Sequence, residues 1–218
     1  RAMVLLQTDA ARERPDRSAA EVGAYLDLAC AALRPAPPRL IAVGGLSGSG
    51  KSVLARALAP RVGALPGAAL LSSDLERKAG QATTTPLDPA AYASDQREAV
   101  YRAIFARAAT LLASGHSVVL DATFVDPELG GMAEEVAAKA SVPFQGVWLD
   151  APREVLEARV LARRGDASDA DLDVLGRQLA ADRGTVTWRL LDASGDPQSV
   201  ADAATAALGG EAAGRPYA

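Results

Sequence analysis

Residues 45–52, with the sequence GLSGSGKS, have the types and spacing of a phosphate-binding loop. They match the pattern G-x-x-x-x-G-K-S/T without a mismatch. Glycines let successive backbone N–H groups turn toward a polyphosphate, and the helix that follows adds the partial positive charge of its first turn. In such a loop Lys51 reaches the β- and γ-phosphates, and the Ser52 hydroxyl binds Mg²⁺.

The neighbouring segments favour this interpretation over a flexible Gly/Ser turn that binds nothing. The apolar run at 40–44 predicts a strand before the loop, and the run at 53–59 predicts a helix after it. Phosphate binding requires this order of strand, loop and helix. We therefore expect a site for ATP and Mg²⁺. The predicted phosphate-binding residues are Gly45, Ser47, Gly48, Ser49, Gly50, Lys51, Ser52 and Val53.

Two aspartates stand at the ends of other apolar runs. Asp121 follows the run at 117–120, as in a Walker B element, and there it would hold Mg²⁺ opposite Ser52. The alternative is an aspartate that only caps a helix or a turn. Asp74 stands at the carboxyl end of a second predicted strand, 68–73.

Strands alternate with helices along most of the chain, which predicts an α/β fold. Further strands are expected at 117–121, 144–149 and 185–191, and further helices at 94–113, 127–140, 152–164, 169–182 and 197–208. Because the strands are apolar throughout, we expect a parallel sheet with helices on both faces. Ligands bind at the carboxyl ends of such strands, so the phosphate loop, Asp74 and Asp121 should share one cleft. Residues 75–89 are turn-rich and predict a loop near it.

Three segments define the predicted domain organisation. Residues 1–38 form a helical appendage and a proline-rich linker, residues 39–208 the main domain, and residues 209–218 a tail. Within the appendage, helices are expected at 2–12 and 18–33. Helical spacing gives the second one an apolar face that must pack on something, formed by Val22, Tyr25, Leu26, Ala29 and Leu33. The cysteine of this helix, Cys30, is expected to be buried.

Composition narrows the possible functions. The chain has 218 residues, 49% of them hydrophobic and 23% charged, which fits one main globular domain. A net charge of −4 argues against a large nucleic-acid-binding surface, but it does not exclude a local basic cleft. One cysteine allows no internal disulfide, and no apolar run approaches the ~18 residues of a membrane span. A cytoplasmic location is expected.

The order of motifs resembles the P-loop kinases related to zeta toxins, polynucleotide 5′-hydroxyl kinases and gluconate kinases, over roughly residues 39–208. Besides the phosphate loop, the resemblance rests on SSDLERK at 72–78, VLDATF at 119–124, arginines at 159, 163 and 164, and LDASG at 191–195. More narrowly, the chain looks like the ATP-binding module C-terminal to an aminoglycoside-phosphotransferase-like domain in some bacterial two-domain proteins. Residues 1–38 would then be the tail of that domain. The domain itself is an expected partner, fused to this chain in the parent protein.

The resemblance implies a P-loop NTPase fold with a five-stranded sheet of order 2-3-1-4-5. It also implies the predicted catalytic residues Lys51, Asp74, Arg77, Arg159 and Arg163. Asp74 would be the general base, Arg77 would contact the acceptor or the γ-phosphate, and a lid would fold the other two arginines over the phosphates. Asp192 and Ser194 would present backbone to the adenine. The alternatives are an N-cap role for Asp74, and arginines on a solvated helix face paired with Glu154 or Glu157.

The function that these residues predict is transfer of the γ-phosphate of ATP to a hydroxyl of a small molecule. Residues 79–90 have few charged or aromatic side chains, so the acceptor pocket matches no single substrate of the family. A polynucleotide 5′-hydroxyl kinase is a rival, but its groove needs clustered basic and aromatic side chains. The other alternative is an ATP-binding or slow ATPase module that regulates a neighbouring domain.

Overall fold

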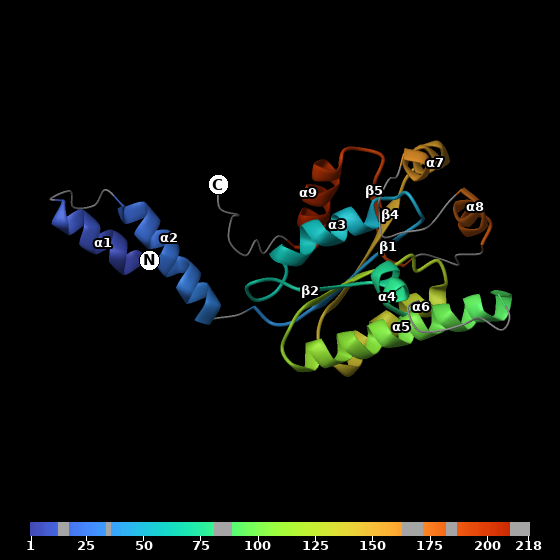
Figure 1. Ribbon diagram of the computed structural model, residues 1–218, viewed down its shortest axis with the longest axis horizontal. Helices are drawn as coiled ribbons and strands as arrows, with labels where there is room; N and C mark the ends of the chain where they lie inside the picture. The colour runs from blue at the N-terminus through green and yellow to red at the C-terminus, as the bar shows by residue number, and fades with distance from the viewer. Residues whose placement is uncertain (13–17, 34–35, 81–88, 163–171, 182–186, 210–218) are drawn as a thin grey trace.

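A five-stranded parallel sheet forms the centre of the protein (Figure 1). The structure, a computed structural model, describes residues 1–12, 18–33, 36–80, 89–162, 172–181 and 187–209. The strands are β1 (Leu40–Gly45), β2 (Ala69–Ser72), β3 (Val118–Asp121), β4 (Phe144–Asp150) and β5 (Arg189–Asp192). Their order is β2-β3-β1-β4-β5, which confirms the predicted fold class and strand order.

The register of the strands brings their carboxyl ends to one edge. Val43 of β1 pairs with Asp121 of β3, and Asp121 pairs on its other side with Ser72 of β2. Gly45 pairs with Leu149 of β4. The end of the first strand, where the phosphate loop begins, therefore lies beside Asp121 and close to the start of the segment that carries Asp74.

Helices cover both faces of the sheet (Figure 1). One face carries α3 (Lys51–Leu58) and α9 (Pro197–Ala207), and the other carries α5 (Pro89–Ala113) and α6 (Pro127–Lys139). Because side chains alternate along β1, Ile41 and Val43 pack with Leu54, Leu58 and Ala204, whereas Leu40 and Ala42 pack with Ile104, Ala108 and Ala133. The two cores fix the orientation of the central strand.

The remaining elements are short. They are the 3₁₀ helix η1 (Ala59–Arg61), α4 (Ser73–Gly80), α7 (Arg153–Ala162) and α8 (Leu172–Ala180). The prediction of a loop from residue 75 is wrong as far as residue 80. Asp74 and Glu76 lie in the first turn of α4 and Arg77 and Lys78 in its last, which complements the helix dipole. Helix α5 begins at Pro89, earlier than predicted, while residues 81–88 lie outside the described ranges.

The N-terminal helices α1 (Ala2–Ala11) and α2 (Ala19–Leu33) pack on each other, beside the layers of the sheet (Figure 1). The buried carboxylate of Asp9 accepts a hydrogen bond from the Ser18 N–H at 2.8 Å. Of the predicted apolar face, Val22 is buried, but Leu26 and Leu33 are exposed. The predicted burial of Cys30 is wrong, because α1 leaves the carboxyl half of α2 exposed. Among the described helices, none is both apolar and long enough to cross a membrane.

Candidate active site

The phosphate loop joins β1 to α3 and depends on three glycines with positive φ. These are Gly45 at +140°, Gly48 at +86° and Gly50 at +94°. A Cβ on Gly48 would lie 2.6 Å from the Leu156 carbonyl oxygen of α7, and one on Gly45 would lie 2.7 Å from the Leu149 carbonyl oxygen. Gly50 is the N-cap of α3 and has no side chain to bond the first-turn amides. The Val53 N–H donates to the Gly50 carbonyl oxygen at 3.0 Å. The first amides of a helix carry its partial positive charge, which suits this end of α3 to an anion.

Lys51 is held inside this loop. Its side chain is buried, and its Nζ donates a hydrogen bond to the Leu46 carbonyl oxygen at 3.1 Å. A lysine ammonium is normally kept in water, so its burial here needs compensating negative charge. The loop and this lysine together fit the β- and γ-phosphates of ATP.

Asp121 and Ser52 form a pair of oxygen donors at the base of the loop. The Asp121 carboxylate is only 4% exposed and accepts hydrogen bonds from the hydroxyls of Ser52 and Ser72. Burial raises the pKa of Asp121, while Ser52 and Lys51 oppose this rise. Within the described ranges no group of three or more His, Cys, Asp or Glu side chains could hold a metal. Mg²⁺ suits such a pair, because it normally keeps water and phosphate oxygens as its other ligands.

Two cavities adjoin this centre. The nucleotide-side cavity, of about 340 Å³, is lined by residues 48–54 of the loop and α3, and also by Arg56, Asp74, Leu149, Arg159, Ala193, Gly195, Pro197 and Val200. The second cavity, of about 480 Å³, is called the acceptor-side cavity because Asp74 and Arg77, the residues predicted to act on the acceptor, line it. Its other residues come from the loop, α4, α5, α8 and the segment 123–129. Among the residues that the structure describes, only Lys51 and Asp74 line both, so they mark the place where the two cavities meet.

Asp74 and Arg77 face this junction from α4. The Arg77 Nη2 lies 3.6 Å from the Asp74 Oδ1, and each side chain is about one-third exposed. Helix α4 already begins at Ser73, so Asp74 lies in its first turn rather than at the N-cap. The structure therefore brings together the two residues that the sequence predicted for the acceptor.

Arg159, which was predicted to belong to a lid over the phosphates, contacts the loop after β5. Its guanidinium donates hydrogen bonds to the carbonyl oxygens of Ala193, Ser194 and Gly195, at 2.7, 3.2 and 3.1 Å. The predicted alternative, a pair with Glu157, does not form, because Glu157 pairs with Arg153 at 2.7 Å. Arg159 thus ties α7 to the loop between β5 and α9. Arg163 lies outside the described residues, so the lid stays a prediction.

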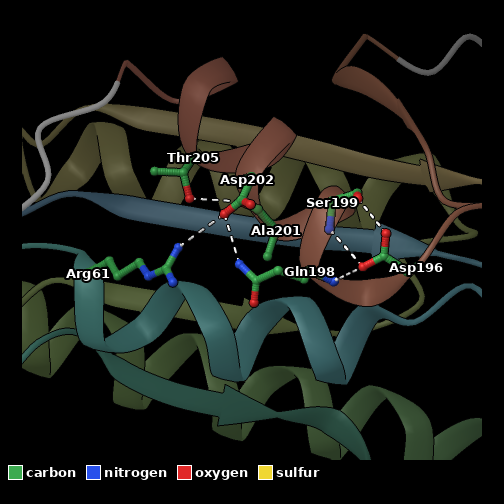
Figure 2. Close-up of polar contacts among 7 residues, drawn as sticks. All are labelled: Arg61, Asp196, Gln198, Ser199, Ala201, Asp202 and Thr205. Carbon is green, nitrogen blue, oxygen red and sulfur yellow. Dashed lines mark hydrogen bonds and ion pairs between the residues drawn. The ribbon is translucent and has the colours of Figure 1, made fainter. Parts of the chain in front are cut away.

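The loop after β5 is fixed at both ends by side-chain acceptors. Asp192 Oδ1 accepts from the Ser194 N–H at 2.8 Å and from its hydroxyl at 2.6 Å, and these bonds lower the pKa of Asp192. Asp196 caps α9 by accepting from the amides of Gln198 and Ser199 (Figure 2). Ala193 and Gly195 line the nucleotide-side cavity. The predicted residues Asp192 and Ser194 thus shape the loop, and their neighbours face the cavity.

Figure 2 also shows how α9 is attached to the neighbouring η1. The Asp202 Oδ1 lies 3.9 Å from the Arg61 Nη1 and accepts a hydrogen bond from the side-chain amide of Gln198 at 2.9 Å. Thr205 donates to the Ala201 carbonyl oxygen within the helix. These exposed contacts hold the helix that follows the loop, and they add no group to the cavity.

Several residues of the acceptor-side cavity were not identified from the sequence. They are Arg97, Val100 and Tyr101 of α5, Thr123, Val125, Asp126 and Leu129, and Val174, Arg177, Gln178 and Ala181 of α8 or just after it. Positions 97, 100 and 101, and 174, 177, 178 and 181, recur at helical spacing, so each set shares one helix face. This helical spacing is the signal in the sequence from which these residues could have been identified. Gln178 also accepts a hydrogen bond from the Ser47 N–H of the phosphate loop at 2.8 Å.

The sheet order and the phosphate loop define a P-loop NTPase fold of the kinase-like type. Residues 40–183 match the family model described as an AAA domain, and the chain belongs to this family. It is 34% identical over 183 residues to uncharacterized proteins of Mycobacterium bovis and Mycobacterium tuberculosis. The match covers 82% of this chain and 36% of theirs, so the chain spans about a third of the length of these curated relatives.

Solved kinase structures share the fold. A gluconokinase of Sinorhizobium meliloti is 27% identical, with a TM-score of 0.55 over 78% of this chain and 91% of that one. A sugar kinase of a Janibacter species is 22% identical, with a TM-score of 0.57 over 79% and 95%. An APS kinase of Mycobacterium tuberculosis, in complex with AMPPNP and APS, is 21% identical, with a TM-score of 0.56 over 79% and 98%. The last two likenesses concern the fold alone. The narrower resemblances, to zeta toxins and to a fused phosphotransferase-like domain, stay predictions.

The first prediction separates metal binding from folding at Asp121. Because burial raises its folded-state pKa, the ionised carboxylate lowers stability above that pKa, and the cost disappears as the pH falls through it. Without ligands, the difference in unfolding temperature between the wild type and Asp121→Asn should therefore move in favour of the wild type as the pH falls from 7 through this pKa. Thermal unfolding with ATP should show extra stabilisation by Mg²⁺ in the wild type and none in the variant.

The matched control is Asp202→Asn, which removes an exposed carboxylate 3.9 Å from Arg61. It should change the unfolding temperature little and leave the response to Mg²⁺ intact. An unchanged Mg²⁺ titration in Asp121→Asn would leave Asp121 with a structural role only.

The second prediction concerns Arg159. Lysine cannot reach three carbonyl oxygens in one plane, so Arg159→Lys should loosen the loop at 193–195 and raise the Kd for ATP by roughly tenfold, as expected for lost hydrogen bonds to a charged group. Arg153→Lys changes an exposed arginine of the same helix that pairs with Glu157 and should leave the Kd unchanged. Calorimetric titration measures both. Equal affinities in the two variants would contradict a role of the loop in ATP binding.

Proposed function

We propose that this protein is an ATP-dependent phosphotransferase that moves the γ-phosphate of ATP to a hydroxyl of a small molecule. The observation that carries the proposal is the junction of the two cavities at Lys51 and Asp74. A kinase needs two sites, one for ATP and one for an acceptor, that meet where the phosphoryl group passes between them. The likeness to a gluconokinase at 27% identity supports this class of reaction.

The nucleotide-side cavity supplies binding and positive charge. Loop amides and Lys51 would hold the phosphates, and the loop at 193–195, fixed by Arg159, would border the base. Ser52 and Asp121 are the residues that would hold Mg²⁺, which supplies neutralising charge at the β- and γ-phosphate oxygens when bound. Each of these groups stabilises negative charge that spreads over the transferring phosphoryl group.

The acceptor-side cavity supplies the base. An acceptor hydroxyl beside Asp74 would form a bond from its oxygen to the γ-phosphorus, while the bond from that phosphorus to the β,γ-bridging oxygen breaks and ADP leaves. The hydroxyl proton passes to the Asp74 carboxylate. Arg77, whose Nη2 lies 3.6 Å from the Asp74 Oδ1, orients this carboxylate before transfer. Since phosphoryl transfer is loose, orientation of the hydroxyl contributes as much as proton removal.

Two observations separate this proposal from its rivals. A module that only binds or hydrolyses ATP has no use for a second cavity of about 480 Å³ beyond Asp74. A polynucleotide kinase needs an open groove that follows several phosphates, whereas this cavity has the size of a small-molecule site. The acceptor is therefore proposed to be a small molecule rather than a nucleic acid.

The third prediction uses variants at the junction. Lys51→Met should lower turnover by about 10² to 10³, because an electrostatic contact in the transition state is lost. Asp74→Asn should lower transfer of labelled phosphate from ATP to an acceptor in a metabolite mixture, with the Kd for ATP unchanged. Label transfer and calorimetric ATP binding measure the two effects separately.

Lys139→Met serves as the control, since Lys139 is exposed on α6 and pairs with Glu135 at 2.9 Å. It should behave as the wild type. Full turnover in Lys51→Met would contradict the assignment of the loop. ATP binding by the wild type without transfer to any component of the mixture would favour the regulatory module. Efficient labelling of a 5′-hydroxyl oligonucleotide, with a rate that falls steeply with salt, would favour the polynucleotide kinase.

A further inference from the structure

The acceptor-side cavity carries more positive than negative charge. Its basic side chains are Lys51, Arg77, Arg97 and Arg177, and its acidic side chains are Asp74 and Asp126. The chain as a whole has a net charge of −4, so the cavity reverses the sign of the overall charge. A hollow lined by one sign of charge concentrates ligands of the other sign, which here are anions.

Both acidic side chains of the cavity already have partners. Asp74 lies 3.6 Å from Arg77, and Asp126 caps α6 by accepting a hydrogen bond from the Glu128 N–H at 2.9 Å. Lys51 belongs to the phosphate loop. The positive charge that remains for a ligand therefore belongs to Arg97 and Arg177, and with the carboxylate of Asp126 it leaves one net positive charge.

Neither of these two arginines forms an ion pair with a carboxylate in the part of the chain that the structure describes. Arg177 makes one long contact, from its Nε to the Asp173 carbonyl oxygen at 3.4 Å. Arg97 acts electrostatically on Tyr101, whose pKa is raised by burial, so the phenol stays neutral and does not compensate the guanidinium. Two forked guanidinium groups on different helices, α5 and α8, line one cavity. Such groups match the paired oxygens of a carboxylate, sulfonate or phosphate.

The rest of the wall combines apolar side chains with the polar side chains of Ser47, Ser73, Thr123 and Gln178. Tyr101 is buried, and the half-buried apolar residues are Val100, Val125, Leu129 and Val174. They come from α5, α6 with the segment before it, and α8. Half-buried apolar side chains around a cavity of about 480 Å³ lose further contact with water when an apolar ligand covers them.

We infer that the acceptor is a hydroxylated small molecule with an apolar body and one anionic group, which Arg97 and Arg177 bind while Asp74 faces the hydroxyl. This inference rests on the proposed function, because it assigns the acceptor of that same site. It adds the charge and polarity of the acceptor and two residues that recognise it. The transfer step is the one described above.

The fourth prediction tests the charge preference by binding alone. The probes are matched pairs of hydroxylated aromatic compounds, each a carboxylate with its neutral alcohol analogue, such as phenyllactate with phenylpropanediol. Calorimetry is done on the protein with Mg²⁺ and AMPPNP bound, so no turnover is needed. The anionic members should bind about tenfold more tightly than their neutral analogues, as expected for charge-assisted hydrogen bonds.

The variants are Arg97→Gln, Arg177→Gln and the double variant, in which this preference should fall to within about twofold. Arg102→Gln is the matched control, because Arg102 is an exposed arginine of α5 that pairs with Glu98. It should keep the full preference. A charge reversal, Arg97→Glu with Arg177→Glu, should move the preference to an amine analogue, which shows that the variant is folded and that the site is charge-selective.

Three results would overturn the inference. They are equal or absent binding of the anionic probes to the wild type, an unchanged preference in the double variant, and a tenfold loss of AMPPNP affinity in either single variant, which would assign that arginine to the triphosphate. The proposed function fails separately. If the anionic preference is present but no phosphate is ever transferred, the ligand assignment stands without the kinase reaction. If neutral acceptors are phosphorylated without any preference, the reverse holds.

Discussion

A buried carboxylate at the end of a central strand is the constraint on which the site depends. Asp121 lies in register between Val43 and Ser72 and accepts hydrogen bonds from Ser72 and from Ser52 of α3. A carboxylate removed from water needs such donors and a nearby cation. The strand register supplies the Ser72 donor, and the start of α3 supplies the Ser52 donor and the Lys51 charge. The sheet, the phosphate loop and α3 are therefore held in one arrangement.

Two helices after β4 support this arrangement from different sides. Arg159 of α7 binds three carbonyl oxygens of the loop that borders the nucleotide-side cavity, and the backbone of Leu156 lies against Gly48. Gln178 of α8 accepts a hydrogen bond from the Ser47 amide on the acceptor side. One helix thus borders the nucleotide-side cavity and the other borders the acceptor-side cavity. The phosphate loop between them is contacted by both, which couples the geometry of the two cavities.

The sequence predicted the fold and the strand order correctly, and it placed the phosphate loop between a strand and a helix, because these features depend on local signals. Residues 45–52 match a motif that binds phosphate only between a strand and a helix, and the flanking residues predict both elements. The position of Asp121 follows from the register of its strand. The acceptor side is different. Arg97 and Arg177 are eighty residues apart, and only the packing of α5 and α8 brings them to one cavity. Arg159 shows the same limit, because only tertiary contacts bring its guanidinium to the carbonyl oxygens of a distant loop.

A crystal structure with AMPPNP and Mg²⁺ tests the central claim most directly, because it locates the γ-phosphate. If the two cavities meet where transfer occurs, the γ-phosphate should contact the Lys51 Nζ at hydrogen-bond distance and face the Asp74 carboxylate across the junction. The base should lie toward the loop at 193–195. A triphosphate that ends away from Asp74, or that binds outside the phosphate loop, would contradict the account.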